Sequence, residues 1–264
     1  MRVVIATLSL ECSARSHIGR RKNNEDAVYW SPRLAAVADG VGGAAAGEVA
    51  SGWIIQALQN LDKSRLGAPL GDALRDAIAW GNETIGFVAS NRPQMSGMST
   101  TLTAVALAND GTYTFANIGD SRTYLLREGD LTQLSRDDSF VQHMIDEGHL
   151  TVEQARRHPS RSLVLEALDG KPDRIPVITS LIACPEDRLL LCSDGLSDVV
   201  ELDALQKLLV AHESRDACVD ALVHLALDSG AHDNVSAIVI DVVPRSDPTT
   251  AWPLQLDPSS TAAQ

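Results

Sequence analysis

The chain has 264 residues, of which 44% are apolar and only 4% aromatic, and it carries a formal net charge of −13. This length suffices for one large domain whose core rests on aliphatic side chains. The negative charge repels nucleic acid and anionic membranes, which argues against a role in binding either. We find no run of about 18 apolar residues and therefore expect no membrane span.

The N-terminal half is expected to combine short strands with two long helices. The apolar run 3–10 could suggest a signal peptide, but polar residues interrupt it, so a first strand is favoured. A glycine-rich turn at 39–43 should join a strand to a helix, and Gly81 and Gly86 weaken the second helix. In chain order, we predict strands at 1–12, 27–30 and 34–38, a polar loop at 16–24, and helices at 45–61 and 70–89.

From residue 100 the apolar residues recur with a period of two, which indicates strands joined by hairpin turns. The polar segment 135–170 contains one expected helix and is a candidate flap. Residues 244–264 are rich in Pro, Ser, Thr and Asp and are expected to form a disordered tail. In chain order, we predict strands at 100–108, 112–118 and 122–127, a helix at 141–147, a strand at 188–192, helices at 202–212 and 216–227, and a strand at 235–243.

The four cysteines form no C-x-x-C pair, and no histidine cluster has the spacing of a zinc site. Cys192 lies within an apolar run, which favours a buried structural thiol. This cysteine usage is typical of a reducing, cytoplasmic compartment.

Four aspartates lie where apolar segments end. Asp39, Asp120 and Asp194 follow predicted strands, and Asp233 precedes the last one. Carboxylates gathered at buried strand ends need a compensating cation, and oxygen ligands suit Mg²⁺ or Mn²⁺. The backbone can bend sharply at Gly40, so that its carbonyl could also face a metal. On spacing alone, a metal site and four unrelated turns remain equally open.

The segment 20–26 places three cationic side chains beside Glu25 and Asp26. Such a segment can be ordinary surface. In a metal site it would supply a guanidinium that binds phosphate and carboxylates that hold metal-bound water.

Residues 40–45 also fit the glycine pattern of a dinucleotide-binding turn, and Asp62 follows at a suitable distance. The context argues against that reading, because Asp39 would place negative charge beside the pyrophosphate. Asp62 also ends a predicted helix rather than a second strand.

Six motifs, each weak alone, occur in one order over about residues 13–243. Together they resemble the metal-dependent protein phosphatases of the 2C type, particularly the bacterial stand-alone forms. The motifs are Gly19…Arg21-x-x-x-Glu25-Asp26, Ala38-Asp39-Gly40-Val-Gly42-Gly43…Gly47-Glu48-x-Ala50-Ser51, Gly97-Met-Ser-Thr100-Thr101, Asn117-Ile-Gly119-Asp120-Ser121-Arg122, Ser193-Asp194-Gly195-Leu-Ser-Asp198 and Asp233-Asn234-Val-Ser236.

The resemblance implies an α+β fold in four layers, αββα, in which two antiparallel sheets pack face to face between pairs of helices. It implies two Mn²⁺ or Mg²⁺ ions at one edge of this sandwich. Asp39 would bridge both ions, Asp194 and Asp233 would complete one, and the Gly40 carbonyl would bind the other. Bacterial relatives often carry a third, weaker metal, to which Asp120 and Asp194 would contribute.

In the same comparison, Glu25 and Asp26 would hold metal-bound waters, and Asn234 would steady Asp233. Arg21 would bind the substrate phosphate. A metal-activated bridging water would then attack the phosphorus of phosphoserine or phosphothreonine in line, without a phosphoenzyme.

The resemblance further implies one catalytic domain at 1–243 with its flap at 135–170, and a monomeric, cytoplasmic enzyme that opposes a Ser/Thr kinase. Two positions depart from the family. Val41 and Asp138 stand where relatives can have histidine, which puts a general acid at the first and a flap contribution at the second in doubt. The alternatives are a pseudophosphatase that binds phosphoproteins and a structural cation-binding domain without turnover.

Overall fold

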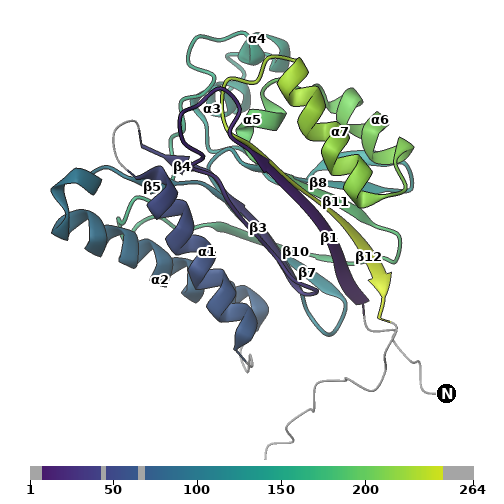
Figure 1. The fold of residues 1–264 in the computed structure, drawn as a ribbon, viewed down its shortest axis with the longest axis horizontal. Helices are drawn as coiled ribbons and strands as arrows, with labels where there is room; N and C mark the ends of the chain where they lie inside the picture. The colour runs from purple at the N-terminus through teal and green to yellow at the C-terminus, as the bar shows by residue number, and fades with distance from the viewer. Residues whose placement is uncertain (1–7, 43–45, 65–68, 246–264) are drawn as a thin grey trace, which may run out of the picture.

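Two antiparallel sheets stacked face to face form the centre of the molecule, and helices cover both outer faces (Figure 1). The computed structural model describes residues 8–42, 46–64 and 69–245. The arrangement confirms the expected α+β fold of four layers. The tail predicted at 244–264 lies outside the described residues from 246 onward, as do the first seven residues of the first predicted strand.

The first sheet joins the two ends of the described chain. Its first strand continues to His17, beyond the predicted limit, because its whole length pairs with the last strand, from Leu8 opposite Pro244 to His17 opposite Val235. The strand order is β1 (Leu8–His17), β12 (Val235–Pro244), β11 (Arg188–Cys192), β8 (Arg122–Arg127) and β9 (Asp130–Gln133).

The second sheet is built from the chain between these strands. Its edge strand β10 was not predicted, because most of its side chains are exposed and show no apolar alternation. Gly40 and Val41, expected in a turn, form the short strand β4 (Gly40–Val41), which pairs with β5 (Ser99–Thr100). The strand order is β10 (Val177–Ile182), β7 (Thr112–Ile118), β6 (Leu102–Leu107), β3 (Leu34–Ala38) and β2 (Ala27–Trp30).

Two pairs of long helices cover the sheets. α1 and α2 lie on the outer face of the second sheet, and α6 and α7 lie on that of the first (Figure 1). The flap holds two short helices, of which only the first was predicted. The helices are α1 (Gly47–Lys63), α2 (Leu70–Asn91), α3 (Phe140–Asp146), α4 (Val152–Arg156), α5 (Asp194–Ser197), α6 (Leu202–Ala211) and α7 (Arg215–Asp228), with a 3₁₀ turn η1 (Pro93–Met95).

Three hydrophobic layers hold the sandwich together. In β3, Ala35 and Val37 face the space between the sheets, whereas Leu34, Ala36 and Ala38 face α1 and α2. Both faces of the central strands are therefore buried, which explains their continuous apolar sequences. No helix in the described ranges is long and apolar enough to cross a membrane.

The two glycines that weaken α2 as a sequence prediction are explained by close approach. A Cβ atom on Gly86 would lie 2.9 Å from the backbone oxygen of Gly170, where the chain leaves the flap. One on Gly81 would lie 2.8 Å from Cδ1 of Ile54 in α1. The two glycines therefore lower the helical propensity of α2 but allow its neighbours to approach it closely.

We predict that Gly86→Ala destabilises the protein by about 1–3 kcal/mol, because the added methyl group meets backbone that cannot move away cheaply. The matched control is Gly52→Ala in α1, where a Cβ atom has no neighbour within 4 Å. That substitution should stabilise by about 0.5–1 kcal/mol through helix propensity alone. Urea denaturation measures both values, and equal effects at the two positions would contradict the packing explanation.

Candidate metal centre

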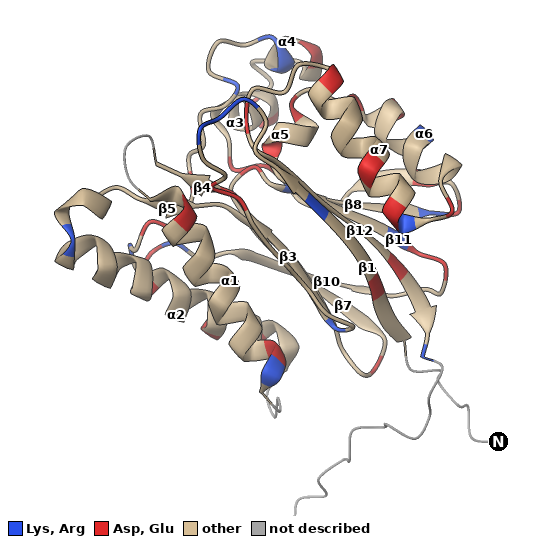
Figure 2. Cartoon of the chain, viewed as in Figure 1, with Lys and Arg blue, Asp and Glu red and all other residues tan. Residues whose placement is uncertain are grey.

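The predicted aspartates meet at one edge of the sandwich. The register places the ends of β3 and β7 together through β6, because Val37 pairs with Thr103 and Thr103 pairs with Asn117. In the first sheet, Cys192 at the end of β11 pairs with Ala237 near the start of β12. The residues just beyond these strand ends are the four aspartates, and Figure 2 shows acidic segments near β4 and at the start of α5.

Asp39 and Asp194 form the centre of the cluster. Burial, followed by the negative charges of Asp26 and Asp194, raises the pKa of Asp39 well above its usual value. Burial, followed by the charges of Asp120 and Asp198, raises the pKa of Asp194 in the same way. Each carboxylate is therefore costly to ionise unless a cation is bound nearby.

Asp26 and Asp120 extend this cluster on two sides. Burial is the largest cause in both cases, and it raises the pKa of Asp26 to about 6 and that of Asp120 to about 7. The Oδ1 atoms of Asp26 and Asp194 are buried without a hydrogen-bond partner. Unpaired carboxylate oxygens within one acidic cluster fit hard divalent cations, which prefer oxygen ligands.

The acidic side chains of this cluster are not arranged as a metal coordination shell. Within the described ranges, no three His, Cys, Asp or Glu side chains are arranged as a group that could hold a metal ion. Asp233 instead pairs with Arg21, whose guanidinium lies 2.6 Å from its carboxylate and supplies a positive charge there. Metal binding would require Asp233 to exchange this partner, and both side chains are accessible enough to move.

Gly40 brings the segment 20–26 against the edge of the sandwich that carries the four aspartates. Its N–H donates to the carbonyl of Glu25 at 3.2 Å. A Cβ atom on Gly40 would lie 2.4 Å from the Gly47 carbonyl carbon and 2.7 Å from the Glu25 oxygen. Glycine is therefore required at this position by the approach of two other segments, in addition to any role of its carbonyl.

Asn234 ties the same segment to Asp233. Its amide nitrogen donates to the carbonyls of Ile18 and Asn23, each at 2.9 Å, and its amide oxygen accepts from the N–H of Glu25 at 2.8 Å. Its own N–H donates to Oδ1 of Asp233 at 2.8 Å. One side chain thus sets the position of the loop that carries Arg21 and Glu25 relative to the start of β12.

Ser193 is a site residue that the sequence analysis did not identify. Its hydroxyl donates to Oδ2 of Asp26 at 2.9 Å and accepts from the N–H of Ser236 at 3.0 Å. It therefore connects the end of β11 to the carboxylate of Asp26. The sequence signals were its position directly before Asp194, at the end of an apolar run, and its place at the start of the motif Ser193-Asp194-Gly195.

Asp138, which departs from the family pattern, joins the flap to the edge of the sandwich that carries the four aspartates. Its Oδ2 accepts from the N–H of Gly119 at 3.0 Å, and its own N–H donates to the Gly119 carbonyl at 2.9 Å. Gly119 directly precedes Asp120. Asp138 thus contacts the turn that carries Asp120.

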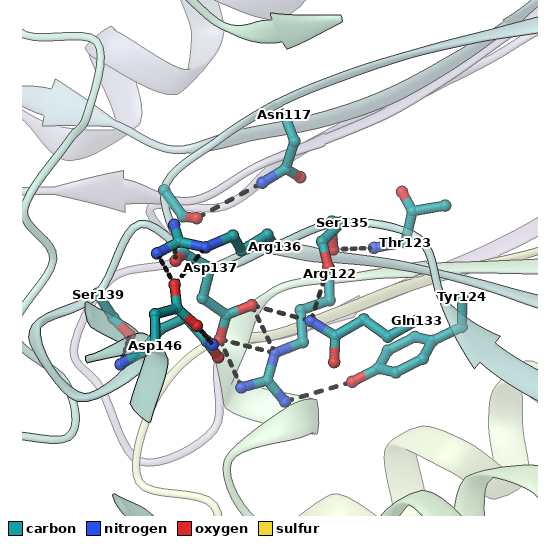
Figure 3. Close-up of polar contacts among 12 residues, drawn as sticks. Asn117, Arg122, Thr123, Tyr124, Gln133, Ser135, Arg136, Asp137, Ser139 and Asp146 are labelled. Atoms are coloured by element: carbon teal, nitrogen blue, oxygen red, sulfur yellow. Dashed lines mark hydrogen bonds and ion pairs between the residues drawn. The ribbon is translucent and has the colours of Figure 1, made fainter. Parts of the chain in front are cut away.

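A buried ion pair holds the neighbouring flap residue. Arg122 at the start of β8 binds both carboxylate oxygens of Asp137, with a shortest contact of 2.6 Å, and donates to the Tyr124 hydroxyl at 3.3 Å (Figure 3). Arg136 on the other side pairs with Asp146 of α3. The first turn of the flap is therefore fixed by charged hydrogen bonds on both sides.

A sequence model of the family Protein phosphatase 2C matches residues 14–232, which is most of the chain. The chain belongs to this family. It is 47% identical over 238 residues to the serine/threonine protein phosphatase PstP of Mycobacterium tuberculosis, a match that covers 90% of this chain and 46% of the relative. The chain thus spans about half the length of that relative. It is 33% identical over 210 residues to the serine/threonine phosphatase stp of Listeria welshimeri, covering 78% of this chain and 82% of that protein.

Solved structures agree with this assignment. The crystal structure of M. tuberculosis PstP/Ppp superposes with a TM-score of 0.85 at 44% identity and covers 90% of this chain and 100% of that one. The catalytic domain of PstP in complex with two manganese ions superposes with a TM-score of 0.84 at the same identity, with the same coverage.

We predict that the metal-free protein loses stability as pH rises from about 4.5 to 7. Asp120 has a folded pKa of about 7 against an ordinary value of 3.8, so the folded state holds a proton that the unfolded chain has released. Raising the pH therefore favours unfolding, by on the order of 2–4 kcal/mol across this range. Thermal unfolding in chelator at several pH values measures the slope.

Asp120→Asn should reduce this slope, leaving the part contributed by Asp26, Asp39 and Asp194, whereas Asp76→Asn on the exposed surface of α2 should leave it unchanged. Added Mn²⁺ should reverse the slope, because metal ligands bind in their deprotonated form. A chelated wild-type protein whose stability rises over this pH range would contradict the electrostatic assignment.

Proposed function

We propose that this chain hydrolyses phosphoserine and phosphothreonine esters in phosphoproteins, using two Mn²⁺ or Mg²⁺ ions. The observation that carries the proposal is the group of buried, mutually repelling carboxylates around Asp39 and Asp194, with unpaired oxygens, at the edge where the family's motifs converge. Membership of the family and its relatives named as serine/threonine phosphatases supply the reaction class.

Asp39 would bridge the two ions, Asp194 and Asp233 would complete one, and the Gly40 carbonyl would bind the other. Asp120, with Asp194, would contribute to a third, weaker ion. When bound, such a pair of ions supplies an activated water as nucleophile and neutralises charge on the phosphoryl oxygens. Removal of protons from these carboxylates, which burial opposes, becomes favourable in the presence of the cations.

Arg21 would hold the substrate phosphate through its guanidinium, which can donate two parallel hydrogen bonds. Its pairing with Asp233 supports this role, because metal binding to Asp233 would free the guanidinium next to the reaction centre. Glu25 and Asp26 would accept hydrogen bonds from metal-bound waters, in positions set by Asn234 and Ser193. The side chain of Val41 has no acidic group, so the leaving serine or threonine oxygen would take its proton from solvent.

The wider assignments belong to the same proposal. We assign residues 1–243 to one catalytic domain with its flap at 135–170, acting as a cytoplasmic monomer on the substrates of a Ser/Thr kinase. A pseudophosphatase would have lost one of the core ligands, and Asp39, Asp194 and Asp233 are all present. No observation favours that alternative.

The first test is metal-dependent hydrolysis of p-nitrophenyl phosphate and of phosphothreonine peptides. Chelator should abolish the activity and Mn²⁺ should restore it. Asp39→Ala should lower kcat by more than about 100-fold, because even residues that only support metal ligands are worth about 10–100-fold. Asp76→Ala, an exposed acidic position on α2, is the matched control and should retain full activity. Full activity in Asp39→Ala would refute the catalytic proposal.

The second test separates substrate binding from metal binding at Arg21. Arg21→Ala should lower kcat/KM by about 10- to 100-fold, the value of a charged hydrogen bond to phosphate. Its Mn²⁺ affinity, measured by calorimetry, should stay the same or rise, because Arg21 no longer competes for Asp233. Arg20→Ala, at the neighbouring position, is the control. A parallel loss of metal affinity and of kcat/KM would contradict a phosphate-binding role.

A further inference from the structure

A cavity of about 230 Å³ lies behind the first turn of the flap, and the proposed hydrolysis makes no use of it. Its walls come from β7 and β10 in one sheet, from β8 in the other, and from the chain between β9 and the flap. It thus lies between the two sheets, beyond the end of the inter-sheet core. The side chains of Phe115, Leu134 and Val177 make its surface mostly apolar.

One polar atom of the lining has no partner. Asn117 is only 7% exposed, and its amide nitrogen donates to the Gly119 carbonyl at 3.5 Å. Its Oδ1 is buried and accepts no hydrogen bond. Figure 3 shows the nitrogen directed at that carbonyl and the oxygen on the opposite side of the amide. A buried amide oxygen left unpaired costs free energy, so this position favours a donor.

The neighbouring polar side chains already have partners. The hydroxyls of Thr103 and Thr123 contact each other at 2.7 Å, and the Ser135 hydroxyl accepts from the N–H of Thr123 at 3.0 Å. At about 30 Å³ each, roughly eight waters would be needed to fill this space, and each needs two to four polar partners. An apolar molecule with a single donor matches these walls better, and apolar cavities of about 150 Å³ are known to take up benzene.

The charges at the mouth are also paired. Arg136 binds Asp146 of α3, and Asp138 accepts from Gly119 and lies 3.7 Å from Arg136. Neither side chain is therefore free to bind an ion of opposite charge. The net charge of −13 further disfavours an anion.

We propose that this cavity binds a small, neutral, mostly apolar molecule whose single N–H or O–H group donates to Oδ1 of Asn117. Aromatic heterocycles of one or two rings are of a suitable size, since an apolar cavity of about 150 Å³ holds benzene and this cavity measures about 230 Å³. The cavity adjoins the turn that carries Asp120, but its lining includes none of the four aspartates. Binding to it can therefore be measured separately from the hydrolytic activity.

The test uses two probes that differ only at the donor, indole and 1-methylindole. Titration of the isotope-labelled protein, followed by amide NMR, should show saturable binding of indole with shifts centred on β7 and β10. Loss of one hydrogen bond should make 1-methylindole bind about 3- to 10-fold more weakly. In Asn117→Leu, which removes the acceptor and keeps an apolar side chain of similar size, the two probes should bind equally.

A second variant tests the proposal even if Asn117→Leu does not fold. Thr179→Trp lies on the exposed edge strand β10 at the rim of the cavity and should block both probes without loss of Mn²⁺-dependent activity. Three results would overturn the proposal: no saturable binding of indole, equal binding of both probes to the wild-type protein, or full binding to Thr179→Trp. A high-resolution crystal structure with indole that shows only ordered waters at Asn117 would also overturn it.

Discussion

The molecule depends on the burial of carboxylates against one another at one edge of the sandwich. Asp39 and Asp194 are half-buried, and Asp26 and Asp120 add further negative charge, so that partial burial and repulsion raise the pKa of all four. Hydrogen bonds from Ser193 and Ser236 offset part of this cost at Asp26, and protons, metal cations or a cationic side chain relieve more of it. Arg21 relieves it in part, at Asp233. The edge is thus poised to exchange protons for divalent cations.

This edge is held together by contacts that leave no room for side chains. A Cβ atom on Gly195 would lie 1.9 Å from the Asn234 backbone oxygen, and one on Gly40 would lie 2.4 Å from the backbone of Gly47. Asn234 then closes the arrangement by hydrogen bonds to the loop before β2. Close backbone approach fixes where the carboxylates lie, and this rigidity is needed because repelling charges would otherwise move apart. The energetic cost of the site is therefore borne by packing in three apolar layers behind it.

Gly119 connects the flap to the edge of the sandwich that carries these carboxylates. Asp138 and Gly119 exchange two hydrogen bonds, and Asp137 is held by Arg122 on the adjacent strand. At the position where relatives can have histidine, Asp138 therefore makes a structural contact with the turn that carries Asp120. The cavity behind this turn shares Asp138 as a wall residue. Asp138 in this way connects the flap, the turn of Asp120 and the cavity.

From the sequence by itself, local apolar patterns predicted most strand and helix limits and showed which carboxylates end strands. The two-sheet fold was implied by the resemblance that the ordered motifs carry. The sequence did not reveal the edge strand β10, whose side chains are mostly exposed, or the role of Ser193, whose partners Asp26 and Ser236 are distant in the sequence. The pairing of Arg21 with Asp233 joins residues 212 positions apart. Only the tertiary structure decided these contacts, because strand register and burial, which set distances and charges, depend on the packing of the whole chain.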